Sequence, residues 1–78
     1  MIPLTMVSPN ENMLIINIRG GNRSRKRLAD LGLYQGISIQ VLNSQMQGPL
    51  IVLVKNSRLV LGRGMAQKIM VEPAIDKS

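Results

Sequence analysis

Ten residues in the first half of the chain, RLADLGLYQG at Arg27–Gly36, constrain the fold more than any other segment. Gly32 follows the apolar residues of a predicted helix, and glycine commonly ends helices because it adopts positive φ without a Cβ clash. Leu33 then stands where the apolar residue of a Schellman motif packs back on the helix. Gly36 is expected to take positive φ in the next turn. The segment therefore predicts a short helix that stops abruptly and leads into a strand.

The predicted helix spans Ser24–Leu31, and the short polar side chain of Asn22 or Ser24 is the expected N-cap. Leu28 and Leu31 lie three residues apart, so both are expected to face the same way and to dock on a sheet. The helix is thus expected to cover one side of the core.

The segments before this helix alternate in polarity, as strands with one buried face do. In the strand expected at Asn12–Arg19, the residues assigned to the inner face are Leu14, Ile16 and Ile18. The ten residues ahead of it are expected to be extended and to add an edge strand, whose alternating apolar residues are Ile2, Leu4 and Met6.

Short strands separated by turn residues also follow the helix. They are expected at Ile37–Leu42, Leu50–Val54, Arg58–Leu61 and Ile69–Val71. The polar segment Asn43–Pro49 is the expected mobile loop, and Lys55–Ser57 has the residues of a hairpin turn. In the last third of the chain, Leu59 and Leu61 are expected to point inward, Gly62 to break the strand, and Ala66 to pack inward from a single helical turn.

About five short strands linked by hairpins within so short a chain are typical of a small barrel. We predict a mainly β fold, an SH3-like barrel of about five strands with one short α-helix between the first two main strands. An OB-like barrel is the main alternative, but its helix more often lies between the third and fourth strands. The chain is expected to form a single domain over residues 1–78, with a core at about 12–72 and a polar tail at 73–78.

The composition argues against catalysis and against a metal centre. The chain has no cysteine and no histidine, so the common ligands of zinc and of transition metals are absent. The same absence removes Ser-His and Cys-His pairs, and the four acidic residues are scattered along the chain. Methionine is more often a core residue than a metal ligand, so the six methionines are assigned to packing. We therefore expect no enzymatic activity, no catalytic residues, no bound metal and no cofactor.

Positive charge is the main functional signal in the sequence. The net charge is +6, and five of the ten cations lie within the nine residues that end at Arg27. A helix N-terminus disfavours cations because of the helix dipole, so helix stability does not explain their position. The cluster is either a solvated face or a surface for an acidic partner. Nucleic acid is the alternative partner, but Tyr34 is the sole aromatic residue available for base stacking.

The aliphatic runs are too short to cross a bilayer, since the longest, Leu50–Val54, is far below the roughly 20 residues that a membrane helix needs. The N-terminal residues do not resemble a signal peptide, because no basic segment precedes them and Pro3 interrupts them. We expect a cytoplasmic protein. The apolar strand Leu50–Val54 and the small core leave weak self-association open.

The order of these signals resembles the ferrous iron transport protein A (FeoA) family of small SH3-like proteins. The matching segments are Arg27-Leu28, Leu31-Gly32-Leu33, Gly36, Ile39 and Val41, Gly48-Pro49-Leu50, Arg58–Gly62, Ala66 and Ile69–Val71. The resemblance covers most of the chain, about Asn12–Glu72. Gln35 departs from it, because the family often has proline there. The motif residues have the character of fold determinants, and those that we assign to the structure are Leu28, Leu31, Gly32, Leu33, Gly36, Leu59, Leu61, Gly62 and Ala66.

This resemblance implies a role beside FeoB, the membrane GTP-binding transporter of ferrous iron, and kinship with the C-terminal domain of iron-dependent repressors. The family supplies no established catalytic residues. As a hypothesis, the cations that contact the transporter are Arg23, Arg25, Lys26 and Arg27. The resemblance thus implies a non-catalytic module that binds and modulates FeoB, and the alternative is a basic SH3-like module that binds nucleic acid or is related to transcription regulators.

Overall fold

A single antiparallel sheet organises the chain in the computed structural model, which describes residues 1–44 and 48–74. Its six strands lie in the order β1-β6-β2-β3-β4-β5. Their bounds are Ile2–Pro3 (β1), Asn12–Ile18 (β2), Ser38–Ser44 (β3), Leu50–Val54 (β4), Ser57–Leu61 (β5) and Ile69–Pro73 (β6). Strands β2 to β5 lie side by side in the same order as in the sequence, whereas β6 returns to pair between β1 and β2.

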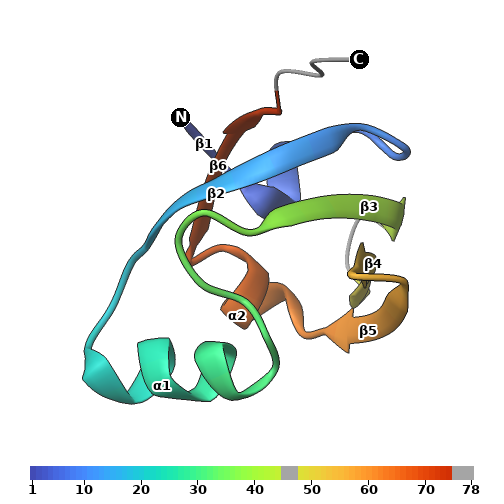
Figure 1. The fold of residues 1–78 in the computed structure, drawn as a ribbon. Coiled ribbons are helices and arrows are strands. Elements are labelled where there is room, and N and C mark those ends of the chain that lie inside the picture. The colour runs from blue at the N-terminus through green and yellow to red at the C-terminus, as the bar shows by residue number, and fades with distance from the viewer. Residues whose placement is uncertain (45–47, 75–78) are drawn as a thin grey trace.

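The helices lie beside this curved sheet (Figure 1). Helix α1 spans Asn22–Asp30 between β2 and β3, and helix α2 spans Arg63–Ala66 between β5 and β6. A 3-10 helix at Leu4–Met6 follows β1. The prediction of a mainly β fold with a short helix between the first two long strands is confirmed, with α1 in that place.

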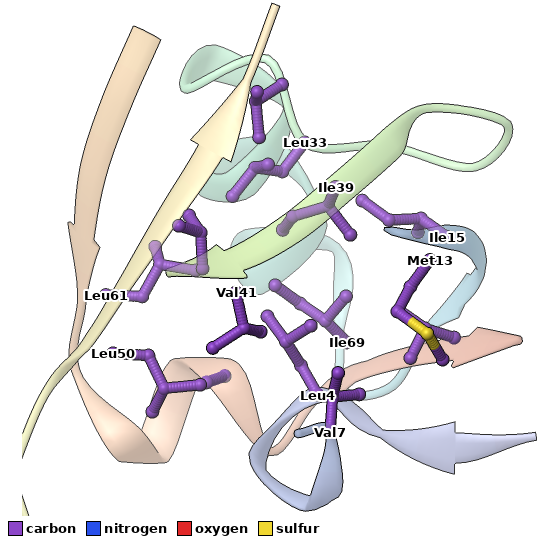
Figure 2. Packing of buried hydrophobic residues seen from close by; sticks show 14 of the residues in the cluster. Leu4, Val7, Met13, Ile15, Leu33, Ile39, Val41, Leu50, Leu61 and Ile69 are labelled. Carbon is purple, nitrogen blue, oxygen red and sulfur yellow. The ribbon is translucent and has the colours of Figure 1, made fainter. Parts of the chain in front are cut away.

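The core is built entirely from apolar side chains in the described part of the chain. Figure 2 shows residues from the strands, from the segment after α1 and from the N-terminal segment pointing into one common space. The fully enclosed large residues are Leu4, Ile15, Leu28, Leu33, Ile39, Leu50, Ile69, Val41, Val52 and Val71. Chain segments far apart in sequence thus share one core, and the packing of each depends on the others.

The predicted inner face of β2 is wrong in part. Met13, Ile15 and Ile18 are buried, whereas Leu14 and Ile16 are only half-buried. The pairing of β2 with β6 shifts register between Ile15 and Asn17. Such a β-bulge inserts one extra residue and moves the inner face from odd to even positions within the strand. The sequence hides this shift because the residues from Met13 to Ile16 are all apolar.

The N-terminal segment forms the predicted edge strand only in part. Ile2–Pro3 pairs with β6 at one end of the sheet, and a 3-10 turn follows, closed by the Val7 N–H, which donates to the Leu4 carbonyl at 3.2 Å. Leu4 and Val7 are buried, while Met6 is 70% exposed. A 3-10 turn has a period of three rather than two, so Leu4 and Val7 share a face. The core therefore includes residues ahead of the expected range 12–72.

The strands β3 to β5 agree closely with the expectations from the sequence. Ile39 and Val41 point inward from β3, and alternate residues of β4 are buried. The β4–β5 turn has Lys55 at φ 48° and Asn56 at φ 66°, the positive values that a two-residue type I′ hairpin requires. The predicted loop at Asn43–Pro49 begins later than expected, because β3 continues to Ser44. Its central residues 45–47 lie outside the described part of the chain, so its mobility stays a prediction.

The motif residues after β4 also pack in this core. Leu61 and Ala66 are buried, and Leu59 is partly buried against the same core. Gly62 precedes α2 at φ −61° with open space around the position of a Cβ. It ends β5 as expected, although its backbone conformation is one that other residues adopt.

Candidate functional site

The basic helix α1 is held in place at its C-terminal end by a Schellman motif. The Gly32 N–H donates to the Ala29 carbonyl at 2.9 Å, and the Leu33 N–H donates to the Leu28 carbonyl at 2.9 Å. Gly32 has φ +88°, a conformation that is strained for a residue with a Cβ. Leu28 and Leu33 are both 0% exposed, so the apolar contact that accompanies this motif anchors the helix in the core. The predicted helix stop is confirmed.

Leu31 does not dock on the sheet, contrary to the prediction. It forms the C-cap residue with φ −89° and ψ 0°, and its side chain is 47% exposed. The Schellman motif pairs the residue at Leu28 with the one beyond the glycine, Leu33. These two positions fill the space that the helix covers, so Leu31 is left at the surface.

The N-terminal end of α1 lacks the expected side-chain cap. The helix starts at Asn22 after Gly21, with no capping hydrogen bond from a side chain and no acidic residue in the first turn. The expected cap Ser24 lies inside the helix, where its Oγ accepts a hydrogen bond from Lys68 Nζ at 2.9 Å. This bond ties the first turns of α1 to the segment that leads into β6. The helix is therefore positioned by tertiary contacts rather than by local capping.

Four cations project from α1, and all four are exposed: Arg23, Arg25, Lys26 and Arg27. Arg25 is also fixed at one point, because its Nε donates to the Ile18 carbonyl at 3.4 Å. Within residues 1–44 and 48–74, none of the four forms a salt bridge, although Asp30 lies on the same helix. We call this group of four side chains the basic face. The structure places the predicted residues on one short helix. At about 100° per residue, Arg23, Lys26 and Arg27 share one side of α1, whereas Arg25 projects from another side, next to the sheet.

A cleft of about 200 Å³ opens beside the basic face, between α1 and β2. Its lining combines apolar and polar side chains, which are Asn17, Ile18, Arg25, Ala29, Leu33, Tyr34 and Gln35. Ile18 and Leu33 are buried, whereas Tyr34 is 45% exposed. The guanidinium of Arg25 thus stands at a cleft with an apolar component, an arrangement suited to an apolar side chain that has a carboxylate next to it.

The sequence alone does not predict this cleft. It forms because the segment after α1 folds back over the end of β2, where the Gly36 N–H donates to the Ile15 carbonyl at 2.8 Å. Tyr34 is held further by Lys55, whose Nζ lies 5.9 Å from the centre of the tyrosine ring. The one available signal is Asn17, a polar residue between Ile16 and Ile18 in β2.

The described residues hold no cluster of three or more acidic, histidine or cysteine side chains that could bind a metal ion. In the same ranges, no buried side-chain nitrogen or oxygen lacks a hydrogen-bond partner. No helix among the described residues has the length and apolar character needed to cross a membrane.

The chain matches a known family along almost its whole length. Residues 2–73 match the model of the FeoA domain. A protein of Methanocaldococcus jannaschii with the name "Putative Fe(2+) transport protein A" is 36% identical over 74 residues, which are 95% of this chain and 89% of that protein. The match to the family model extends beyond the motif segments and includes the N-terminal residues that contribute Leu4 to the core.

Solved structures show the same fold. The crystal structure of an iron uptake regulatory protein, FeoA, is 37% identical and has a TM-score of 0.89 over 94% of this chain and 97% of the other. The manganese regulator SloR has a TM-score of 0.82 at 16% identity, over 94% of this chain but 34% of the regulator, so this likeness concerns the fold alone. These similarities confirm the SH3-like fold class, and the chain belongs to the FeoA family of ferrous iron transport proteins.

Proposed function

We propose that this protein is a non-catalytic accessory of ferrous iron uptake, which binds the cytoplasmic GTP-binding part of the iron transporter FeoB and modulates transport. Family membership supports the link to iron transport, since the M. jannaschii relative carries the name of an Fe(2+) transport protein. A cytoplasmic location follows from the same proposal, because that is where the GTP-binding part of the transporter lies.

The observation that carries the proposal is the basic face of α1. Three of its cations, Arg23, Arg25 and Lys26, lie in the first turns of a helix that has no acidic residue there, although the helix dipole favours anions at that end; Arg27 lies in the last turn, where the dipole favours a cation. Like charges at neighbouring helix positions also repel each other. The helix is therefore less stable than a helix with mixed charges, and an acidic partner offsets this cost by supplying the missing anions.

The cleft beside the basic face gives the contact its specificity. Arg25 is held by Ile18, and its two remaining nitrogens are available to a carboxylate in the paired geometry that guanidinium groups favour. The apolar side chains of the cleft can receive a neighbouring apolar residue of the partner. We expect the bound segment of the transporter to place an acidic residue beside an apolar one.

A pair of charge-removing variants tests the proposal. Arg25→Gln with Lys26→Gln lowers the net charge by two on the basic face. Asn12→Asp with Asn43→Asp lowers it by the same amount at exposed positions near the start of β2 and the end of β3, across the molecule from α1 (Figure 1). We expect the first variant to bind the isolated cytoplasmic domain of FeoB about tenfold more weakly and the second to change the affinity less than about threefold.

Both variants should keep the melting temperature of the parent within a few degrees, since all four positions are exposed. Equal affinity of the two variants would refute the role of the basic face. An equally large loss of affinity in both variants would indicate that binding depends on the net charge alone and not on the basic face.

Nucleic acid is the second candidate partner, and the net charge of +6 favours it. Against it, Tyr34 is the sole aromatic residue of the chain, so stacking on several bases is not available. We do not expect specific binding to nucleic acid. DNA binding that weakens steeply with salt and exceeds binding to the transporter domain would favour this alternative.

A further inference from the structure

The strand β5 forms one end of the sheet. It pairs with β4 along its whole length, from Ser57 beside Val54 to Leu61 beside Leu50, and with no other strand of the described chain. Figure 1 shows β5 at the margin of the molecule, between the β4–β5 turn and α2. Its outer side is therefore the open edge of the sheet.

The turn geometry determines which main-chain groups face this open edge. A two-residue hairpin turn makes the flanking pair, Val54 and Ser57, a hydrogen-bonded pair, and hydrogen-bonded pairs then alternate along the ladder. The N–H and C=O groups of Ser57, Leu59 and Leu61 accordingly face β4. Those of Arg58 and Val60 face away from β4, and no hydrogen bond from another described segment reaches them.

The side chains of the same two residues are also at the surface. Val60 is 68% exposed and Arg58 is exposed, while Leu59 and Leu61 point into the core. Natural proteins often protect an open edge with a β-bulge or a proline; β5 has neither, and Arg58 is the one charged residue on it. The edge thus offers two free donors, two free acceptors and an apolar contact at its centre.

Charge identifies the kind of segment that suits this edge. No acidic residue occurs anywhere in residues 31–71, and the charged residues of that range are Lys55, Arg58, Arg63 and Lys68. A second copy of this chain would bring a surface of the same sign against Arg58, which disfavours self-pairing. An extended segment with acidic side chains matches both the open ladder and the charge.

We infer that the edge of β5 binds an extended acidic segment of the partner protein as an additional strand, with an apolar residue of that segment against Val60 and an acidic one beside Arg58. The inference takes the identity of the partner, the cytoplasmic domain of FeoB, from the proposed function, and the site itself from the sheet geometry. This second contact lies on a different element from the basic face. A partner that binds at both places is therefore held in one orientation relative to this protein.

Amide hydrogen exchange measured by NMR tests the geometry. In the free protein, the amides of Arg58 and Val60 should exchange much faster than those of Leu59 and Leu61. Addition of the FeoB cytoplasmic domain should slow the exchange at Arg58 and Val60 at least tenfold. The same measurement with a peptide of alternating glutamate and valine, and with its lysine counterpart as the control, examines the edge independently of the transporter.

Two substitutions at Val60 provide a matched comparison. Val60→Pro removes the outward N–H but leaves the ladder to β4 intact, and edge strands tolerate proline in this position. Val60→Thr keeps the N–H and the branched shape. We expect Val60→Pro to bind the domain about tenfold more weakly and Val60→Thr to bind within about twofold of the parent. Arg58→Glu, whose side chain is exposed, should weaken binding as well and serves if the proline variant does not fold.

The possible results separate the two proposals. If the domain binds but Arg58 and Val60 stay unprotected, and the two Val60 variants bind equally, the edge proposal is wrong while the proposed function stands. If the domain does not bind but the acidic peptide protects Arg58 and Val60, the proposed function is wrong and the edge still binds acidic strands. Absence of protection with both probes overturns the edge proposal, and protection by a second copy of the chain alone replaces the partner with self-association.

Discussion

Replacement of Leu28 by alanine should remove a large part of the stability of this protein. Leu28 is the single residue buried from α1, and it packs in the same core as Leu33 beyond the helix stop. A buried Leu→Ala substitution costs about 2–5 kcal/mol, from lost burial and from the cavity that remains. A domain of 78 residues has a free energy of unfolding of roughly 4–12 kcal/mol, so the loss amounts to between about a sixth of this free energy and all of it.

Leu31→Ala is the matched control, because it makes the same chemical change three residues later, at the C-cap of α1. Its side chain is 47% exposed, so its removal leaves no cavity and should cost less than about 1 kcal/mol. Urea unfolding followed by far-ultraviolet circular dichroism measures both variants, since the chain has no tryptophan to report by fluorescence. At about 4–8 °C per kcal/mol, Leu28→Ala should lower the melting temperature by roughly 10 °C or more.

Two results would contradict the buried position of Leu28 and the exposed position of Leu31. If Leu31→Ala destabilised the protein as much as Leu28→Ala, both leucines would be docked, as the spacing in the sequence suggests, and the described placement of α1 would be wrong. A loss below about 1 kcal/mol for Leu28→Ala would mean that the helix is not anchored in the core.

Two further substitutions test the ends of α1 by thermal unfolding. Gly32→Ala should cost about 1 kcal/mol of stability, because φ at Gly32 is +88°. Gly62→Ala is the control: φ is −61° and the space around the Cβ position is open, so the free energy of unfolding should change by less than about 0.5 kcal/mol. Equal effects of the two substitutions would contradict the Schellman geometry. Lys68→Met keeps the aliphatic stem but removes the bond to Ser24, and it should cost about 1 kcal/mol; a neutral result would mean that this bond does not position the helix.

The sequence correctly predicts those parts of the fold whose conformation depends on residues close together in the chain. Gly32 and Gly36 both take positive φ, and the hairpin at Lys55 and Asn56 forms where turn residues separate two apolar strands. In each case the backbone conformation depends on residues only a few positions apart. The cations of the basic face could also be assigned to one helix, because they are adjacent in the sequence.

The errors concern features that depend on distant segments. The inner face of β2 is set by a bulge against β6, and four consecutive apolar residues allow either face to be buried. Leu31 has the spacing of a buried residue, but the space beneath the helix is filled by Leu33. The cleft depends on the segment after α1 folding back over β2, and the open edge of β5 depends on the sheet order; no local pattern contains either. Long-range packing therefore decides the interaction surfaces, while local signals decide the elements.

A direct binding titration tests the central claim, namely that this FeoA protein contacts the cytoplasmic GTP-binding domain of FeoB through its basic α1 face. Calorimetry with that domain, beside a titration with duplex DNA at the same two salt concentrations, separates the two candidate partners. The account predicts saturable binding to the domain that weakens with added salt, and no measurable binding to DNA at physiological salt. Binding to DNA with a steep salt dependence, together with no binding to the domain, would contradict it.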